Sequence, residues 1–354
     1  MSNFRTGIGV MSGTSLDGID LAWCRFEEHT DGVWNYQVLK ADTSPYPAEF
    51  RARLANATGL SALEYCKLNV DLGEVIATRI NEFVGSDEKP NFIASHGHTV
   101  FHQPDEGLTT QIGSGAVIAA RTGITTVCDF RTLDVAHHGQ GAPLVPIGDE
   151  LLFGQYDACL NLGGFSNISF RQNDKRVAFD ISPCNMALNN LANRIGLPYD
   201  KDGEAARSGN FIQSMLEELN NLEYYSRSRP KSLGKEWFES SFLPISDKYA
   251  ASAPIEDCLH TVSTHIAQQI AHSIPTSAQE MLITGGGALN RFLIEQIGNF
   301  WPKNVRIPDK LTINYKEAII FAFLGILRLE QQANCLRSVT GADVNCCGGC
   351  IWHP

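Results

Sequence analysis

The chain has 354 residues, 43% of them hydrophobic and 19% charged, with a formal net charge of −11. This length suits two domains better than one core, and the apolar content argues against global disorder. So acidic a chain repels phosphate on average, which argues against nucleic acids and anionic membranes as partners.

Targeting and membrane signals are missing from the sequence. No apolar run approaches the roughly 20 residues that span a bilayer, and the first five residues lack the layout of a signal peptide. We therefore expect a cytoplasmic protein whose ten cysteines are reduced thiols.

The first half of the chain opens with three predicted strands, at residues 7–11, 19–26 and 33–39. A turn rich in Gly, Ser, Thr and Asp joins the first two. A short helix carrying Phe50 and Leu54 follows, and a longer helix begins at Ser61, which has capping-box spacing to Glu64.

The second half repeats this outline, with predicted strands at residues 159–162, 168–171 and 176–180. Residues 163–167 form the glycine turn. A helix is expected to begin near Pro183 and to end near Gly196. Farther along, residues 281–284 form a strand that runs into three glycines, and a last helix covers about 315–331.

The pattern strand, glycine turn, strand, strand, helix therefore occurs twice. It predicts an α/β protein of two mixed domains, an outline that resembles the actin, hexokinase and Hsp70 superfamily. We expect that two-domain fold, a duplicated RNase H-like fold with a central inter-domain cleft. The expected N-terminal domain is residues 1–140 plus 332–354, and the C-terminal domain is residues 141–331.

The first glycine turn is a candidate phosphate site, because backbone N–H groups beside glycine and hydroxyls of Ser and Thr bind phosphate oxygens. Asp17 and Asp20 could organise Mg²⁺ through water. The alternative is an ordinary hairpin turn, with Asp17 as a turn former. The candidate residues are Ser12, Gly13, Thr14, Ser15, Leu16, Asp17, Gly18, Ile19 and Asp20.

Two later glycine turns are further phosphate or nucleotide candidates. Gly163 and Gly164 lie at the matching point of the second half, with a tight turn as the alternative. Gly285, Gly286 and Gly287 end a strand before a helical segment, where backbone can approach a nucleotide closely.

Asp180 is the candidate catalytic base. It ends a predicted inner strand just before a helix, where a carboxylate could take a proton from a nucleophile. The alternative is a helix N-cap.

Polar residues elsewhere could bind a sugar. His96, His98 and Thr99 are expected in a turn after a strand, and Arg131 would suit a carboxylate or phosphate. The alternatives are ordinary turn residues and a surface ion pair. A zinc site formed by Cys346, Cys347, Cys350 and His353 is disfavoured, because no partner pair accompanies the Cys-x₂-Cys spacing.

Residues 9–20 resemble the opening signature of the anhydro-N-acetylmuramic acid kinases. Similar segments follow in order at residues 95–99, 140–146, 161–167, 200–203, 285–290 and 316–318. The resemblance covers nearly the whole chain. The first segment is specific to the family, whereas the glycine turns are shared by related kinases.

The resemblance implies a kinase that converts 1,6-anhydro-N-acetylmuramic acid, ATP and water into N-acetylmuramic acid 6-phosphate and ADP, in the recycling of bacterial cell-wall sugar. It implies ATP and Mg²⁺ as cofactors and a homodimer. Asp180 falls on the family's catalytic aspartate. The sugar-side positions that the resemblance indicates are His96, Thr99, Asn185 and Glu317.

The sequence departs from the family at three places. Residues 181–185 read Ile-Ser-Pro-Cys-Asn where Thr-Gly-Pro-Gly-Asn is common. His98 stands where glutamine is usual, and Met11 stands where the wider superfamily has an aspartate. The alternatives are a kinase of another sugar or amino sugar and a non-catalytic ATP-gated binding protein.

Overall fold

The computed structural model describes residues 4–13, 16, 18–29, 32–229 and 231–354. The chain divides into two compact units: unit 1 is Met1–Gly154 with Tyr315–Pro354, and unit 2 is Gln155–Asn314. Residues 141–154 and 315–331, expected in the second domain, lie in unit 1. There Gly148 packs so closely on Ile320 that an added Cβ would come within 2.6 Å of its side chain.

Unit 1 is built on a seven-stranded sheet whose main order is β12-β6-β4-β1-β2-β3, with β5 paired to β4. The strands β1, β2 and β3 form an antiparallel meander, whereas β4 runs parallel to both β1 and β6. The strands are β1 (Phe4–Ser12), β2 (Ile19–Glu28), β3 (Trp34–Ser44), β4 (Phe92–Gln103), β5 (Leu108–Ile112), β6 (Thr126–Cys128) and β12 (Cys350–Trp352).

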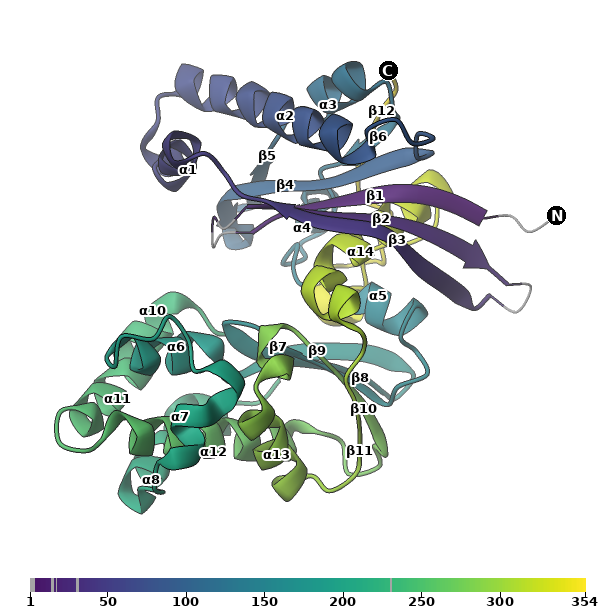
Figure 1. The fold of residues 1–354 in the computed structure, drawn as a ribbon. Helices are drawn as coiled ribbons and strands as arrows, with labels where there is room; N and C mark the ends of the chain where they lie inside the picture. Colours follow the sequence, from purple (N-terminus) through teal and green to yellow (C-terminus); the bar gives the residue numbers. More distant parts are fainter. Residues whose placement is uncertain (1–3, 14–15, 17, 30–31, 230) are drawn as a thin grey trace. The chain divides into compact units, whose positions relative to one another are not determined.

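The helices α2 and α3 cover one face of this sheet and α14 covers the other (Figure 1). The predicted capping box at the start of α2 is confirmed, since Ser61 and Glu64 bond each other's backbone N–H. The helices are α1 (Ala48–Ala55), η1 (Ala57–Gly59), α2 (Ala62–Val84), η2 (Pro104–Glu106), α3 (Gly115–Thr122), α4 (Thr132–Ala136), α5 (Pro146–Leu151), α14 (Lys310–Leu329) and α15 (Arg337–Thr340).

Alternation along β1 sends small and large residues to opposite faces of the sheet. Ile8 and Val10 enter the core under α2, together with Leu72. Gly9 faces α14, where an added Cβ would overlap the carbonyl oxygen of Ala318. Glycine at this position therefore lets the helix backbone touch the strand backbone.

Unit 2 has a five-stranded sheet of order β11-β10-β7-β8-β9. The strands β7, β8 and β9 form an antiparallel meander, and β10 runs parallel to β7 and β11. The strands are β7 (Ala158–Leu162), β8 (Phe165–Gln172), β9 (Lys175–Pro183), β10 (Glu280–Thr284) and β11 (Asn304–Arg306). The strands β6, β4, β1, β2 and β3 of unit 1 thus have the same order and directions as β11, β10, β7, β8 and β9 of unit 2, which confirms the predicted mixed α/β class and its duplication.

The long helix α12 is the centre of the helical layer in unit 2, where its buried face packs with α6, α8 and α13 in one apolar core. The predicted helix after Asp180 begins at Asn185 instead of Pro183, because β9 continues to Pro183. The helices are α6 (Asn185–Asn193), η3 (Lys201–Gly203), α7 (Glu204–Ser208), α8 (Gln213–Asn220), α9 (Glu223–Ser226), α10 (Lys235–Trp237), η4 (Phe238–Phe242), α11 (Leu243–Ala250), α12 (Ile255–Ser273), η5 (Gly286–Leu289) and α13 (Arg291–Phe300).

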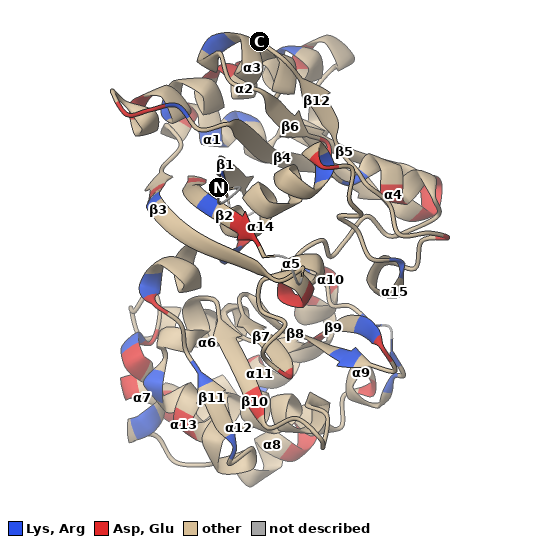
Figure 2. Cartoon of the chain, turned by 90° about the vertical axis from the view of Figure 1, so that its right-hand side faces the viewer, with Lys and Arg blue, Asp and Glu red and all other residues tan. Residues whose placement is uncertain are grey.

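Charged residues of both signs are interspersed on the helices of unit 2 (Figure 2). On α7 and α13, for example, Arg207 pairs with Glu295 at 2.7 Å. Across the described residues, every helix is too short or too polar to cross a membrane.

The contact at Gly9 predicts a stability effect. In Gly9→Ala the new methyl group forces β1 and α14 apart, so we expect the free energy of unfolding to fall by about 1–3 kcal/mol, the usual cost of overpacking. Gly298→Ala is the control, because Gly298 lies inside α13 with open space around it and should gain up to about 1 kcal/mol. Urea denaturation of both variants measures this, and equal midpoints would contradict the close contact.

Candidate active site

The first glycine turn joins β1 to β2. Thr14, Ser15 and Asp17 lie outside the described residues, whereas Ile19 and Asp20 already belong to β2. Leu16 has a positive φ of 59° and its N–H donates to the carbonyl of Gly13 at 3.2 Å. An added Cβ at Gly18 would lie 2.5 Å from the carbonyl oxygen of Ser44. The turn is therefore tight and depends on glycine where it meets β3.

A chain of buried hydroxyls orients the end of β1. The Tyr46 hydroxyl donates to Ser12 Oγ at 2.7 Å, and Ser12 Oγ lies 3.2 Å from His98 Nδ1. Burial raises the pKa of Tyr46 to about 12 and lowers the pKa of His98. His98 is therefore neutral at pH 7 and shares a hydrogen bond with a Ser12 hydroxyl that already accepts from Tyr46.

His96 and His98 lie inside β4, not in the turn that the sequence predicts. Val10 opposes Ser95 while Ser12 opposes His98, so β4 holds one extra residue at this point. Gly97 has a φ of +69°, and an added Cβ would overlap the carbonyl oxygen of Ile112. The bulge is what brings His96 and His98 to their separate partners.

Arg131 and His96 form a buried polar pair. Arg131 Nε and Nη2 lie 3.1 and 3.0 Å from His96 Nε2, and Nη1 donates to the carbonyl of Gly141 at 2.6 Å. Burial, and then the charge of Arg131, lower the pKa of His96 to about 3. Burial also lowers the pKa of Arg131 to about 10. At neutral pH His96 is therefore an acceptor that fixes a charged guanidinium.

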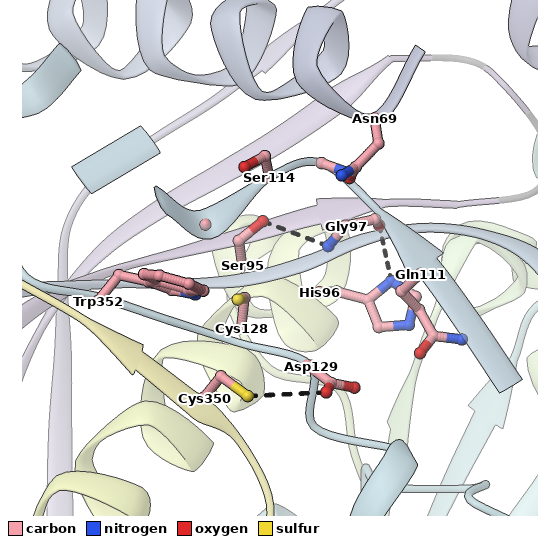
Figure 3. A pocket seen from close by; sticks show the side chains of 12 residues that line it. Asn69, Ser95, His96, Gly97, Gln111, Ser114, Cys128, Asp129, Cys350 and Trp352 are labelled. Atoms are coloured by element: carbon pink, nitrogen blue, oxygen red, sulfur yellow. Dashed lines mark hydrogen bonds between the residues drawn. The ribbon is translucent and has the colours of Figure 1, made fainter. Parts of the chain in front are cut away.

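A pocket of about 260 Å³ lies beside His96 (Figure 3). Gln111 donates from Nε2 to the hydroxyls of Thr99 and Thr109, and its buried Oε1 has no hydrogen-bond partner among the described residues. The lining residues are Asn69, Ser95, His96, Gly97, Gln111, Gly113, Ser114, Gly115, Cys128, Asp129, Cys350 and Trp352. The walls are mainly neutral and polar, and one acceptor is left for a ligand.

Glu317 lies on α14 at the end of the unit 1 sheet. Desolvation raises the pKa of its carboxyl, Arg131 opposes that shift, and Asp20 adds to it. The side chain itself remains open to solvent. Asp20 accepts a hydrogen bond from Thr43 at 2.7 Å. Two carboxylates and one guanidinium thus influence one another within unit 1.

The neighbouring Lys316 was missed as a site residue by sequence reasoning. It pairs with Asp149 at 2.7 Å, and both side chains are only 6% exposed. Breaking one half of such a buried pair costs about 3–5 kcal/mol, so the pair fixes the helical turn around Lys316 against α5. The only signal in the sequence is that Lys316 stands just before the long apolar run of α14, which begins after Glu317.

In unit 2 the turn between β7 and β8 uses its carbonyl groups to hold α6. The carbonyl of Gly164 accepts the N–H of Cys184 at 2.8 Å and that of Met186 at 3.1 Å, and Gly163 accepts the N–H of Asn185 at 3.0 Å. The Asn185 side chain donates to the carbonyl of Leu162 at 2.9 Å. Cys184 is buried at the N-cap of α6, and its φ of −125° lies outside the left-handed region that favours glycine.

The third glycine turn lies against the same place. Gly285 has a φ of +81°, and an added Cβ would come within 2.6 Å of Asn161 Oδ1. A Cβ on Gly287 would lie 3.1 Å from Asn185 Oδ1, whereas Gly286 has nothing closer than 3.6 Å. The structure therefore brings both glycine turns of unit 2 and Asn185 together at the ends of β7 and β10.

Asp180 lies within β9, an edge strand of the unit 2 sheet, and not on the predicted inner strand. It does not cap α6, whose N-cap is Cys184. Asp180 Oδ2 accepts the N–H of Leu233 at 2.9 Å, and its carbonyl accepts the Tyr224 hydroxyl at 2.6 Å. Burial raises the pKa of this carboxyl, and the bond from Leu233 opposes the shift. Of the described residues, none bonds the other oxygen, Oδ1.

The late cysteines do not share one site. Cys346 opposes Cys335, Cys347 Sγ lies 4.0 Å from the carbonyl of Leu327, and Cys350 Sγ lies 3.8 Å from Asp129. His353 contacts Thr125. Cys346, Cys347, Cys350 and His353 therefore each have a different partner.

The low pKa of His96 predicts a pH dependence of stability. Below pH 6.5 the imidazole of His96 binds a proton in the unfolded chain, whereas in the folded chain it binds that proton only near pH 3. This residue therefore lowers the free energy of unfolding by up to about 1.4 kcal/mol for each pH unit below 6.5. His96→Gln keeps an acceptor for Arg131 but cannot titrate, so its stability should fall less between pH 7 and pH 5. Urea denaturation at pH 7 and pH 5 measures the free energy of unfolding of both proteins. An equal fall in the variant and the wild type would contradict the buried neutral imidazole.

Comparison with known proteins identifies the family of the chain. The family model for anhydro-N-acetylmuramic acid kinase matches residues 5–354. A protein of that name from Francisella tularensis subsp. novicida is 34% identical over 97% of this chain and 97% of its own length. Others from Hydrogenovibrio crunogenus and Vibrio cholerae are 33% and 34% identical, each over 98% of both chains. The chain belongs to the anhydro-N-acetylmuramic acid kinase family.

Proposed function

We propose that this kinase converts 1,6-anhydro-N-acetylmuramic acid, ATP and water into N-acetylmuramic acid 6-phosphate and ADP, with Asp180 as its general base. The observation that carries the proposal is the setting of Asp180. Its carboxyl has a raised pKa, one oxygen is held by Leu233, and the backbone is anchored by Tyr224. A carboxylate held in this way is a stronger base than a solvated one, and it presents one oxygen in a fixed direction.

The substrate explains why a base is needed. In a 1,6-anhydro sugar O6 carries no proton, so an ordinary hydroxyl deprotonation is not possible. Water instead attacks C1, the C1–O6 bond breaks, and O6 takes the γ-phosphoryl group. Asp180 accepts the proton of that water, a step usually worth roughly 10²–10⁴-fold in rate.

The glycine turns are the proposed nucleotide-binding elements of each unit. The positive φ of Gly285 sets the shape of this turn, and Gly286, where an added Cβ would meet nothing closer than 3.6 Å, suits the close approach of a nucleotide. Gly286, Gly287, Gly163 and Gly164 complete the turns of unit 2, and the turn from Ser12 to Asp20 serves unit 1. ATP supplies the phosphoryl group, and Mg²⁺ neutralises its charge.

The residues of unit 1 fit a hard cation such as Mg²⁺. Desolvation and then the nearby Asp20 charge raise the pKa of the Glu317 carboxyl, so two carboxylates that could serve as oxygen ligands lie near one another. Asp17 is the second proposed ligand from sequence, and it lies outside the described residues.

The sugar-side groups of unit 1 are Arg131, His96 and the pocket beside them. Arg131 suits the carboxylate of the muramic acid side chain. The pocket, with the unpaired Gln111 Oε1 and the neighbouring Thr99 hydroxyl, suits an uncharged acetamido group that donates an N–H. Glu317 completes this set in unit 1, and Asn185 joins Asp180 in unit 2.

The wider role follows from the family. We place the enzyme in the recycling of cell-wall sugar in the cytoplasm, acting as a homodimer, with no nucleic acid or membrane partner. The family model matches residues 5–354, which include both units, and this supports the proposal.

Substrate choice is tested by ADP release with Mg-ATP and one sugar at a time. We expect turnover with 1,6-anhydro-N-acetylmuramic acid and none above background with N-acetylmuramic acid, glucose or no sugar. In water enriched in ¹⁸O the product should carry the label at C1. Turnover with an ordinary sugar and no labelled oxygen would instead identify a simple hydroxyl kinase.

The base is tested by Asp180→Asn, which keeps the size and the acceptor for Leu233 but cannot take a proton. We expect turnover to fall roughly 10²–10⁴-fold while ATP affinity, measured by calorimetry, is unchanged. Asp174→Asn, at the exposed turn of the same β8–β9 hairpin, is the matched control and should be fully active. Near-normal turnover of Asp180→Asn would remove this residue from the mechanism.

A further inference from the structure

Two cysteines near the end of the chain lie directly opposite each other in unit 1. Cys335 N–H donates to the carbonyl of Cys346 at 3.1 Å, and Cys346 N–H donates back at 3.3 Å. Residues that exchange both backbone bonds in an antiparallel pair have Cα atoms about 5.5 Å apart. That separation lies within the range that a disulfide spans.

Both thiols also converge on one buried carboxylate. Cys335 Sγ lies 2.9 Å from Asp134 Oδ1, and Cys346 Sγ lies 3.9 Å from the same oxygen. Thr340 Oγ1 donates to Oδ1 at 2.8 Å, and the N–H of Gly141 donates to Oδ2 at 2.8 Å. All three of Asp134, Cys335 and Cys346 are at most 4% exposed. The reduced thiols are therefore part of what solvates the Asp134 charge.

We propose that Cys335 and Cys346 are a redox-sensitive pair that closes to a reversible disulfide under peroxide. The Cys346 sulfur attacks one oxygen of hydrogen peroxide and forms a sulfenic acid, releasing water. The Cys335 sulfur then attacks the Cys346 sulfur and displaces the second oxygen as water. Two thiols lose two electrons to one peroxide, and both thiol protons end in the two waters.

The surroundings decide which sulfur reacts first and how peroxide reaches it. A hydrogen bond from Cys335 lowers the pKa of Cys346, which makes Cys346 the attacking thiol. Exposed residues lie close by in the sequence, since Arg337 is two residues after Cys335 and Asn345 directly precedes Cys346. The pair therefore lies directly beneath the surface, within reach of a small oxidant.

The disulfide has a consequence for the sugar-side residues, and this step rests on the proposed function. Oxidation removes two S–H groups from the neighbourhood of Asp134 and leaves Thr340 and Gly141 as its donors. Asp134 already attracts Arg131, and Gly141 connects them, since it donates to Asp134 and accepts from Arg131. A less solvated Asp134 draws the guanidinium away from its place beside His96. We expect the KM for the sugar to rise roughly tenfold, the effect of about one weakened charged contact, with the KM for ATP unchanged.

Peptide mapping of the full chain tests the bond itself. Trypsin cuts after Arg328 and Arg337, so Cys335 and Cys346 fall on separate peptides, residues 329–337 and 338–354. After peroxide treatment and alkylation we expect these two peptides to be joined, and dithiothreitol to separate them. Cys346→Ser should abolish the link, while Cys347→Ser, its sequence neighbour, should retain it. The serine hydroxyl can still donate to Asp134, so the fold is kept.

Three outcomes would overturn the proposal. Cys335 and Cys346 could both stay reduced, and so be alkylated afterwards, at a peroxide concentration that oxidises the exposed Cys66. The link could survive in Cys346→Ser and vanish in Cys347→Ser. The purified chain could instead hold one equivalent of zinc that shields both thiols from peroxide. A disulfide that forms with unchanged KM for the sugar refutes only the coupling to Arg131, and mapping needs no activity, so it is independent of the proposed reaction.

Discussion

The contact between Gly9 on β1 and the backbone of α14 is the constraint on which unit 1 depends. Because the carbonyl of Ala318 occupies the space of a Cβ on Gly9, α14 packs directly against the backbone of β1. Lys316 and Glu317 precede that contact by one or two residues, so their positions follow from it. The buried bond from Lys316 to Asp149 then holds the same turn of helix from its other side. A site built on a rigid helix and strand is positioned more accurately than one built on a loop.

A connected set of buried polar groups continues from this contact. His96, Arg131, Gly141 and Asp134 follow one another by hydrogen bonds, and the C-terminal segment supplies Thr340 and the two thiols. Each member satisfies its neighbour, which is the condition under which buried polar groups are tolerated. Binding groups and structural groups are therefore connected here, since Gly141, which accepts from Arg131, also donates to the Asp134 carboxylate that bonds the C-terminal segment.

The fold was largely predictable because its signals are local. Strand alternation, the capping box at Ser61 and the repeated glycine turns all predict the elements that are present. The bulge in β4 was not predictable, since His96 and His98 depend on a mismatch with β1 that no local pattern reveals. The extension of β9 beyond Asp180 was hidden by Pro183, which suits the start of a helix as well as the last residue of an edge strand.

The candidate site was predictable in its residue types but not in their partners. Family resemblance indicated Asp180, yet its anchors Leu233 and Tyr224 lie some 44–53 residues away along the chain. The glycine turns of unit 2 were found separately, and only the structure shows that they share Asn185. Interactions of this kind are set by tertiary packing, which periodicity and motif spacing do not reveal.

The discontinuity of unit 1 bears on the order in which the chain can fold during synthesis. Unit 2 is one continuous stretch, Gln155–Asn314, with its own apolar core. Unit 1 needs α14 on its sheet and β12 paired with β6; α14 begins only at Lys310, near the end of that stretch, and β12 follows it. On the ribosome, unit 2 can therefore close while the sheet of unit 1 still exposes the face that α14 will cover. During that interval the glycine-rich side of β1 is open, and the nascent chain is most exposed to misassociation there.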